Sequence, residues 1–349
     1  MKHLNLLARF LFVIIAVQAC TAAAGDYQIV KTARVMGQGG IDYVYADNDN
    51  RRLYVARGGQ VLVFDEDTFL SVGTITNARA RDEAVDPVSN HGFCSSSPIV
   101  MWDAKTLAPL KTIDVQGRPD AIFFEPLTER VYVLSHSAPN VTVIDGKDGT
   151  IVGTIDLGGS PEQAQSDGQG HVYVDLEDKD SIAVVDAHTL KVTATYDISS
   201  KGGGPAGLGL DAKNHILFAM CHEPATCVVV NADTGKILAA LPIGTGTDGG
   251  GFNPATMEAF SSQGDGTLTI IKENSPTDFA VEQTVTTKPR AKTCTLDTKN
   301  NQIILITVER PATVVTTDTN AVAGAAAPAG KRRGGYNGPG LLDIIAVGK

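Results

Sequence analysis

Residues 130–159 read RVYVLSHSAPNVTVIDGKDGTIVGTIDLGG, and they decide the fold because the chain repeats their pattern along almost its whole length. A short segment rich in β-branched and aromatic residues comes first, and a polar loop follows it. A second alternating segment ends in Asp145, and a turn then leads into a third segment. The stretch therefore predicts a run of short antiparallel strands.

Five further copies of this pattern lie about 40 residues apart, a period typical of propellers and other repeat arrays. Each copy has another apolar segment upstream, such as DAIFFEP at 120–126, so every unit supplies four strands. Four-stranded units repeated around an axis are the blades of a β-propeller. The five copies occupy residues 51–75, 90–115, 170–198, 214–243 and 257–285.

A seventh unit is divided between the two ends of the chain. Residues 292–307 supply two strands, residues 341–348 supply a third, and the unattached segment YQIVKTARV at 27–35 supplies the outer one. This closure pairs both terminal edges, which would otherwise be templates for aggregation. We therefore predict an all-β fold, a seven-bladed β-propeller of four-stranded blades closed by its N-terminal strand. Residues 25–349 form a single domain in this prediction, and we expect a monomer.

Residues 310–340, between the second and third strands of the seventh unit, differ in composition from the repeats. They are rich in Ala, Gly and Pro and have little apolar bulk to pack, so we predict a flexible surface insertion.

Residues 1–24 are predicted to be an export signal. An apolar run at 10–17 follows a basic segment, and three alanines at 22–24 form a small-residue cleavage site. Residues 17–20 (VQAC) also resemble a lipobox, which would make Cys20 a lipid anchor, so anchoring and soluble release both stay open. We expect a periplasmic or extracellular protein.

The net charge disfavours nucleic acid as a partner. It is −10 for the whole chain and −12 without residues 1–24, which carry Lys2 and Arg9 and no acid. Nucleic-acid binding depends on Lys and Arg that neutralise phosphates. A local basic patch can override net charge, so this function remains an alternative. Its candidate residues are Arg79, Arg81, Arg118, Lys288, Arg290 and Lys292.

Four cysteines remain after residue 24, at positions 94, 221, 227 and 294. Cys221 and Cys227 bracket HEPAT, a predicted hairpin loop, so they are candidates for a disulfide, which export permits. The alternative is a pair of buried thiols. The cysteine spacings match no zinc or redox motif.

The loops that lead into the first strand of each unit are the expected site. Together with the loops between second and third strands they surround the channel mouth, and repeat proteins carry functional loops on one face. Aligning the units on Asp120 in GRPDAIFFEP gives a ring of four acids, two bases and one alanine. Its members are Asp42, Arg81, Asp120, Glu162, Ala206, Asp248 and Lys292.

Four carboxylates around a narrow mouth would raise one another's pKa, bind a cation, or pair with the two basic residues. His136 in LSHSAPN and His222 in CHEPATC are predicted to reach the same face, and histidine with carboxylates is a ligand set for divalent metals. No spacing of these residues along the sequence shows that they meet in such a site. The alternative is that the acids accept hydrogen bonds from backbone amides and hold the loops. The candidate metal ligands are Asp42, Asp120, Glu162 and Asp248.

The stretch at 132–159 resembles the YVTN repeat of bacterial seven-bladed β-propellers, a family that includes YncE-like exported proteins. The resemblance runs from about Tyr27 to the C-terminus, except for residues 310–340, and it departs from the consensus at 93–103 and 259–271. It implies a propeller and an exported or surface location. Some relatives bind ligands, nucleic acid or cell-surface partners, but a shared propeller does not transfer a reaction.

The sequence contains no GxSxG elbow and no P-loop. We therefore predict a binding or scaffold protein whose ligand, a protein, a glycan or a small molecule, lies over the channel mouth. The alternative is a metal-dependent hydrolase or lyase similar to propeller lactonases. In it a divalent cation on the acidic ring polarises a carbonyl and a loop histidine is the acid or base. A divalent cation is the only cofactor that this alternative requires.

Overall fold

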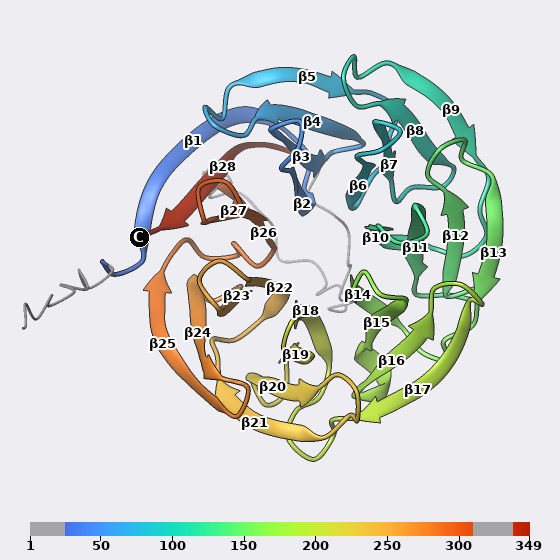
Figure 1. The fold of residues 1–349 in the computed structure, drawn as a ribbon. Coiled ribbons are helices and arrows are strands. Elements are labelled where there is room, and N and C mark those ends of the chain that lie inside the picture. Colours follow the sequence, from blue (N-terminus) through green and yellow to red (C-terminus); the bar gives the residue numbers. More distant parts are fainter. Residues whose placement is uncertain (1–24, 310–337) are drawn as a thin grey trace, which may run out of the picture.

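Seven four-stranded antiparallel sheets surround a central channel in a computed structural model of the chain (Figure 1). The structure describes residues 25–309 and 338–349. Within these ranges the only helical element is the 3-10 turn η1 (Glu177–Lys179), and no helix is long and apolar enough to cross a membrane. The prediction of an all-β, seven-bladed propeller is confirmed.

Blades 1 to 3 follow one another along the chain, each with its first strand nearest the channel. Blade 1 contains β2 (Ile41–Asp47), β3 (Arg52–Arg57), β4 (Gln60–Asp65) and β5 (Ser71–Ile75). Blade 2 contains β6 (Glu83–Asp86), β7 (His91–Cys94), β8 (Ile99–Asp103) and β9 (Pro109–Ile113). Blade 3 contains β10 (Pro119–Glu125), β11 (Arg130–Ser135), β12 (Val141–Asp145) and β13 (Ile151–Ile155).

Blades 4 to 6 continue the same order. Blade 4 contains β14 (Pro161–Ser166), β15 (His171–Leu176), β16 (Ser181–Asp186) and β17 (Lys191–Asp197). Blade 5 contains β18 (Pro205–Asp211), β19 (Ile216–Cys221), β20 (Thr226–Asn231) and β21 (Ile237–Pro242). Blade 6 contains β22 (Thr247–Asn253), β23 (Glu258–Gln263), β24 (Thr267–Ser275) and β25 (Asp278–Thr286).

Blade 7 combines strands from both ends of the chain. It contains β26 (Cys294–Asp297), β27 (Gln302–Glu309), β28 (Pro339–Gly348) and, outermost, β1 (Gln28–Gln38). Strand β1 runs antiparallel to β28, from Gln28 opposite Gly348 to Gln38 opposite Pro339. The predicted closure is therefore confirmed, with a longer strand than expected. The predicted export signal, Cys20 and most of the predicted insertion lie outside the described residues.

Side-chain caps explain why Asp, Asn and Thr recur at the turn between the third and fourth strands. Asp103 accepts hydrogen bonds from the backbone N–H and the hydroxyl of Thr106, at 2.7 and 2.9 Å. Asn231 accepts the same two bonds from Thr234, at 3.0 and 2.6 Å. Such a cap gives the backbone N–H groups of the turn a hydrogen-bond partner nearby in the sequence. The sequence therefore specifies where each hairpin bends.

The apolar core lies between neighbouring blades. Trp102 is fully buried between blades 1 and 2, where its ring centroid lies 5.7 Å from that of Tyr54. Because side chains alternate between the two faces of a sheet, each blade buries apolar residues against both neighbours. The fold therefore depends on a complete ring.

Cys221 and Cys227 do not form the predicted disulfide. Both are free thiols and both are fully buried. Cys227 lies opposite Met220 in the β19–β20 pair, and Cys221 lies opposite Thr226. A shift of one residue turns a side chain to the other face of the sheet, so Cys221 packs toward blade 4 and Cys227 toward blade 6. The prediction was wrong because a short loop brings the two cysteines close in the sheet but does not determine which face of the sheet each side chain lies on.

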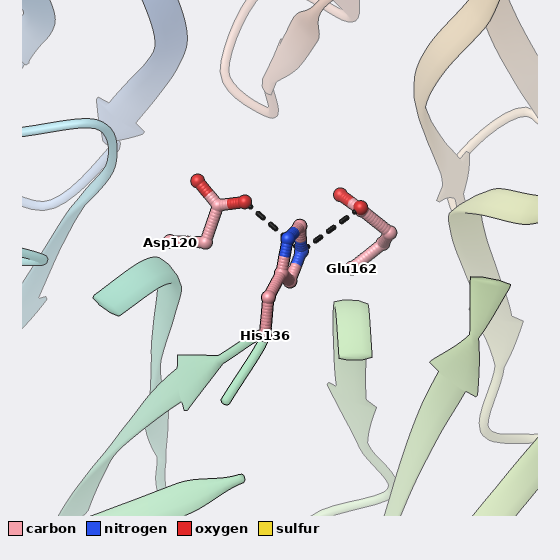
Figure 2. Close-up of side chains that lie close together, drawn as sticks. All are labelled: Asp120, His136 and Glu162. Carbon is pink, nitrogen blue, oxygen red and sulfur yellow. Dashed lines mark ion pairs between the residues drawn. The ribbon is translucent and has the colours of Figure 1, made fainter. Parts of the chain in front are cut away.

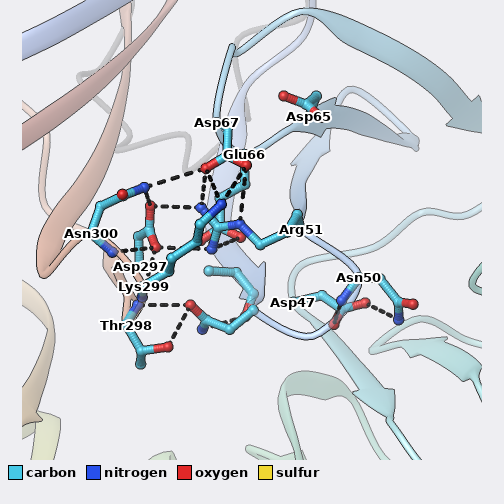
Figure 3. Close-up of polar contacts among 12 residues, drawn as sticks. Asp47, Asn50, Arg51, Asp65, Glu66, Asp67, Asp297, Thr298, Lys299 and Asn300 are labelled. Carbon is cyan, nitrogen blue, oxygen red and sulfur yellow. Dashed lines mark hydrogen bonds and ion pairs between the residues drawn. The ribbon is translucent and has the colours of Figure 1, made fainter.

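Ion pairs reinforce the seam between blades 7 and 1 (Figure 3). Arg51, at the β2–β3 turn, lies 2.7 Å from Asp67 and 2.9 Å from Asp297 at the end of β26. Lys299 of blade 7 lies 3.1 Å from Asp67. The hydrogen bonds from Arg51 and Lys299 hold the pKa of Asp67 well below its usual range. The seam between blades 7 and 1, which the chain crosses once between β1 and β2, thus has several charged contacts.

We expect deletion of residues 25–38 to prevent formation of a stable monomer. The deletion would leave the edge of β28 unpaired, and an unpaired edge is a template for aggregation. Size-exclusion chromatography and thermal unfolding test this expectation, with a chain that begins at Gly25 as the control. A truncated protein that stays monomeric and unfolds cooperatively would show that β1 is dispensable.

Candidate functional site

The aligned ring positions lie at the start of the innermost strands, and their charges pair across blades. Arg81 of blade 2 lies 3.3 Å from Asp42 of blade 1 and 2.9 Å from Asp120 of blade 3. Lys292 of blade 7 forms an ion pair with Asp248 of blade 6. The seventh position, Ala206, is buried. Both basic positions therefore neutralise acids of neighbouring blades.

His136 joins the remaining acid to this network (Figure 2). It lies in the β11–β12 loop, and its Nε2 is 3.0 Å from a carboxylate oxygen of Asp120 and 3.0 Å from one of Glu162. The Tyr43 hydroxyl of blade 1 donates a 3.3 Å hydrogen bond to Glu162 of blade 4. One atom each from His136, Asp120 and Glu162 lie within 4.8 Å of one another, a set that can hold a metal ion.

These contacts shift the pKa of several groups at the mouth. The ion pair with Glu162 raises the pKa of His136 above its ordinary value, although burial opposes the shift. Burial alone would raise the pKa of Glu162, but His136 outweighs it and lowers that pKa. Burial, with Asp120 nearby, raises the pKa of Asp42 to about 6. The charge of the mouth therefore changes near pH 6.

His222 reaches the mouth face as predicted, but its partners are different. Its Nε2 contacts the Thr247 carbonyl oxygen, and its Nδ1 lies 3.7 Å from Glu177. It is not part of the cluster that His136 forms with Asp120 and Glu162. The structure therefore brings only one of the two predicted histidines to the acidic ring.

Sequence reasoning missed two acids that follow Arg81. Asp82 accepts hydrogen bonds from the backbone N–H groups of Glu83 and Ile122, at 2.9 and 3.0 Å. Burial raises the pKa of Asp82 to about 8. The Glu83 side chain is fully buried, neither of its oxygens has a hydrogen-bond partner, and burial raises its pKa strongly. The signal was the run RDE at 81–83, where charged residues enter an innermost strand.

A cavity of about 510 Å³ lies in the channel below the ring. Its lining begins at Tyr43, Asp82 and Gln163, each one residue after a ring position, and reaches the exposed turn residues Asp49 and Pro87. These turns connect first and second strands, so they lie at the end of the channel away from the mouth. The charged ring therefore caps the cavity.

Half of the basic residues considered for nucleic-acid binding already hold ion pairs. Arg81 and Lys292 pair with ring acids, and Lys288 lies 2.8 Å from both Glu309 and Asp343. Their charge is thus committed to carboxylates of the same chain, which weakens the case for a basic face.

Comparisons with known proteins support the fold. No family model matches the sequence, and no curated protein matches it. A chain in the crystal structure of a mitotic checkpoint complex is similar, with 13% identity, a TM-score of 0.70, and coverage of 86% of this chain and 95% of that one. The WD40 repeats of RRP9 have 10% identity, a TM-score of 0.70, and coverage of 93% and 100%. Such low identities show a shared fold alone.

We expect the pKa of His136, measured by NMR, to lie above the ordinary value of about 6.5 and to fall in Glu162→Gln. A raised folded pKa stabilises the protein fully below the unfolded value, and the effect is lost as pH rises through the folded value. His136→Gln should therefore lower the free energy of unfolding by about 1 kcal/mol at acid pH and by less at alkaline pH.

Denaturant unfolding near pH 5.5 and near pH 9 measures this difference. His222→Gln is the matched control, because it removes a histidine of the same face that lies outside the cluster. An equal loss of stability at both pH values in His136→Gln would contradict a charged link between Asp120 and Glu162.

Proposed function

We propose that the protein is an exported propeller of the YVTN-repeat type that binds a macromolecular partner at the channel mouth. The observation that carries this proposal is the paired network of Asp42, Arg81, Asp120, His136 and Glu162, which blades 1 to 4 contribute. Its groups hold one another in place, so little side-chain conformational freedom would be lost when a partner binds. Export is supported by the composition of residues 1–24 and by the repeat pattern.

The charge of the mouth favours a partner protein with exposed Lys or Arg. The four acids of the ring outnumber its two bases, and Glu177 adds a further carboxylate beside His222. Arg81 and Lys292 are about half exposed, so the network also offers hydrogen-bond donors at its surface. Complementary charge of this kind speeds association and selects among partners. The fold similarity to a chain of a multi-protein complex agrees with such a role.

We expect the double variant Asp42→Asn/Glu162→Gln to lose its partner. Purified protein would be immobilised, bound proteins from a periplasmic extract quantified by mass spectrometry, and the affinity of each measured by surface plasmon resonance. Removing two mouth carboxylates should weaken binding at least about tenfold, roughly 1.4 kcal/mol, and reduce its salt dependence.

The matched control is Asp148→Asn/Asp278→Asn, which removes the same charge from exposed positions away from the mouth. This control should bind like the native chain. An unchanged set of partners and affinities in the mouth variant would overturn the proposal that the mouth is the binding surface.

A second candidate function is metal-dependent hydrolysis, which the convergence of Asp120, His136 and Glu162 favours. These three side chains would hold a divalent cation, which polarises a carbonyl as a Lewis acid when bound. The contact of Arg81 with Asp120 weighs against it, because an arginine already neutralises one proposed ligand. The binding function therefore remains the main proposal.

Elemental analysis after incubation with Zn²⁺ and dialysis distinguishes the two functions. For a metal site we expect one ion per chain in the native protein and in His222→Ala, and none in His136→Ala or Asp120→Ala. Lactone hydrolysis that follows the metal content would establish the enzyme. No bound ion in any of the four proteins would eliminate it and leave the cluster as an ion-pair network.

A further inference from the structure

The cavity below the ring has the size of a small-molecule site. Its volume is about 510 Å³, and ligand pockets commonly span about 300–1,000 Å³. Residues from six of the seven blades line it. The network at the mouth does not use this space, so the cavity calls for a separate interpretation.

Several of the residues that line the cavity are aromatic. Tyr45, Phe123 and Phe124 are half-buried and therefore keep part of their surface toward open space, and Phe252 is nearly buried. Phe123 and Phe124 lie on opposite faces of β10, and an aromatic ring presents a negative face that attracts organic cations. The wall thus suits an apolar group with a positive charge.

The charged residues of the lining have one sign. The lining includes three carboxylates and no Lys, Arg or His. Asp49 lies at the exposed rim, and Asp47 caps its own turn by accepting bonds of 3.1 and 2.8 Å from Asn50. Asp82 lies at the deep end, one residue below Arg81. The electrostatic potential of the cavity therefore favours a cation over an anion.

Asp82 is the deep carboxyl that a cation would meet. Each of its oxygens accepts one backbone hydrogen bond, from Glu83 and from Ile122, which fixes its position and leaves lone pairs for a ligand. Within residues 25–309 and 338–349, no basic side chain forms an ion pair with it. Burial raises its pKa to about 8, and a cation bound beside it would favour the ionised form.

Glycines bring the backbones of β18 and β22 close together beside the cavity. A Cβ on Gly207 or Gly209 would lie 2.8 Å from backbone atoms of Gly249 or Gly251, so β18 and β22 approach with their backbones almost in contact. Gly250 and Gly251 of β22 contribute bare backbone to the lining. Bare backbone of β22 therefore forms part of the cavity wall, beside the ring of Phe252 in the same strand.

We propose that the channel cavity binds a small organic cation of the alkyl- or arylammonium class, with its charge against Asp82 and its apolar part among Tyr45, Phe123 and Phe124. The ligand enters from the end of the channel where Asp49 and Pro87 are exposed. This site is independent of the binding surface at the mouth.

Isothermal titration calorimetry near pH 9 tests this site with three probes of similar size. They are benzyltrimethylammonium, the neutral benzyl alcohol and the anion phenylacetate. We expect the cation to bind at least tenfold more tightly than the alcohol, and the anion not to bind at millimolar concentration. Asp82→Asn should lose at least tenfold in affinity for the cation and keep its affinity for the alcohol.

A control keeps the charge argument specific. Asp148→Asn removes an exposed carboxylate at a distant turn, so it should bind the cation like the native chain. Equal affinity for cation and alcohol, full affinity in Asp82→Asn, or no binding of any probe would overturn the proposal. If Asp82→Asn fails to fold, the comparison of probes on the native chain still decides it.

Discussion

The pairing of β1 with β28 is the constraint on which the rest of the structure depends. Each blade buries apolar side chains against both neighbours, so the interface between blades 7 and 1 exists only when the two ends of the chain meet. Closing so long a loop costs conformational entropy, although the cost grows slowly with length. The buried residues shared by the two blades and the charged contacts of Arg51 and Lys299 offset that cost at the seam.

Ring closure also determines what the mouth can do. Residues about 40 positions apart in the sequence meet on one axis because each begins an innermost strand. Arg81 bridges Asp42 and Asp120, and His136 bridges Asp120 and Glu162, so cationic groups of the chain itself separate the carboxylates. A network of this kind is ordered without a ligand. A partner or a metal ion must therefore displace or share existing contacts, which favours a surface for binding over an open coordination site.

The sequence predicted the features that follow from the repeat, and it missed the features that depend on how side chains and strands pack. Seven in-phase copies specified the blades, the N-terminal closure and the ring positions, because the phase of a repeat places its residues in space. The phase did not reveal that Cys221 and Cys227 face opposite sides of β19 and β20, since that depends on register. The ring has one position in each blade, and in blade 2 that position is Arg81, so the alignment did not include the next residue, Asp82. The cavity is lined by residues from six blades, and no single repeat encodes that convergence.

Acids at the channel mouth and acids just below it differ in how they are neutralised. At the mouth, Arg81, His136 and Lys292 lie beside the carboxylates. Just below it, Asp82 and Glu83 are adjacent acids at the start of the innermost strand β6, and burial raises the pKa of both. Two consecutive buried carboxyls destabilise a fold whenever they ionise, and an amide of the same shape would not. Local conflicts with the folding pattern concentrate at functional sites, because function requires groups that stability alone would not select. Asp82 lines a cavity and its carboxyl accepts bonds from backbone amides alone, so it is the acid of this pair that a ligand can reach.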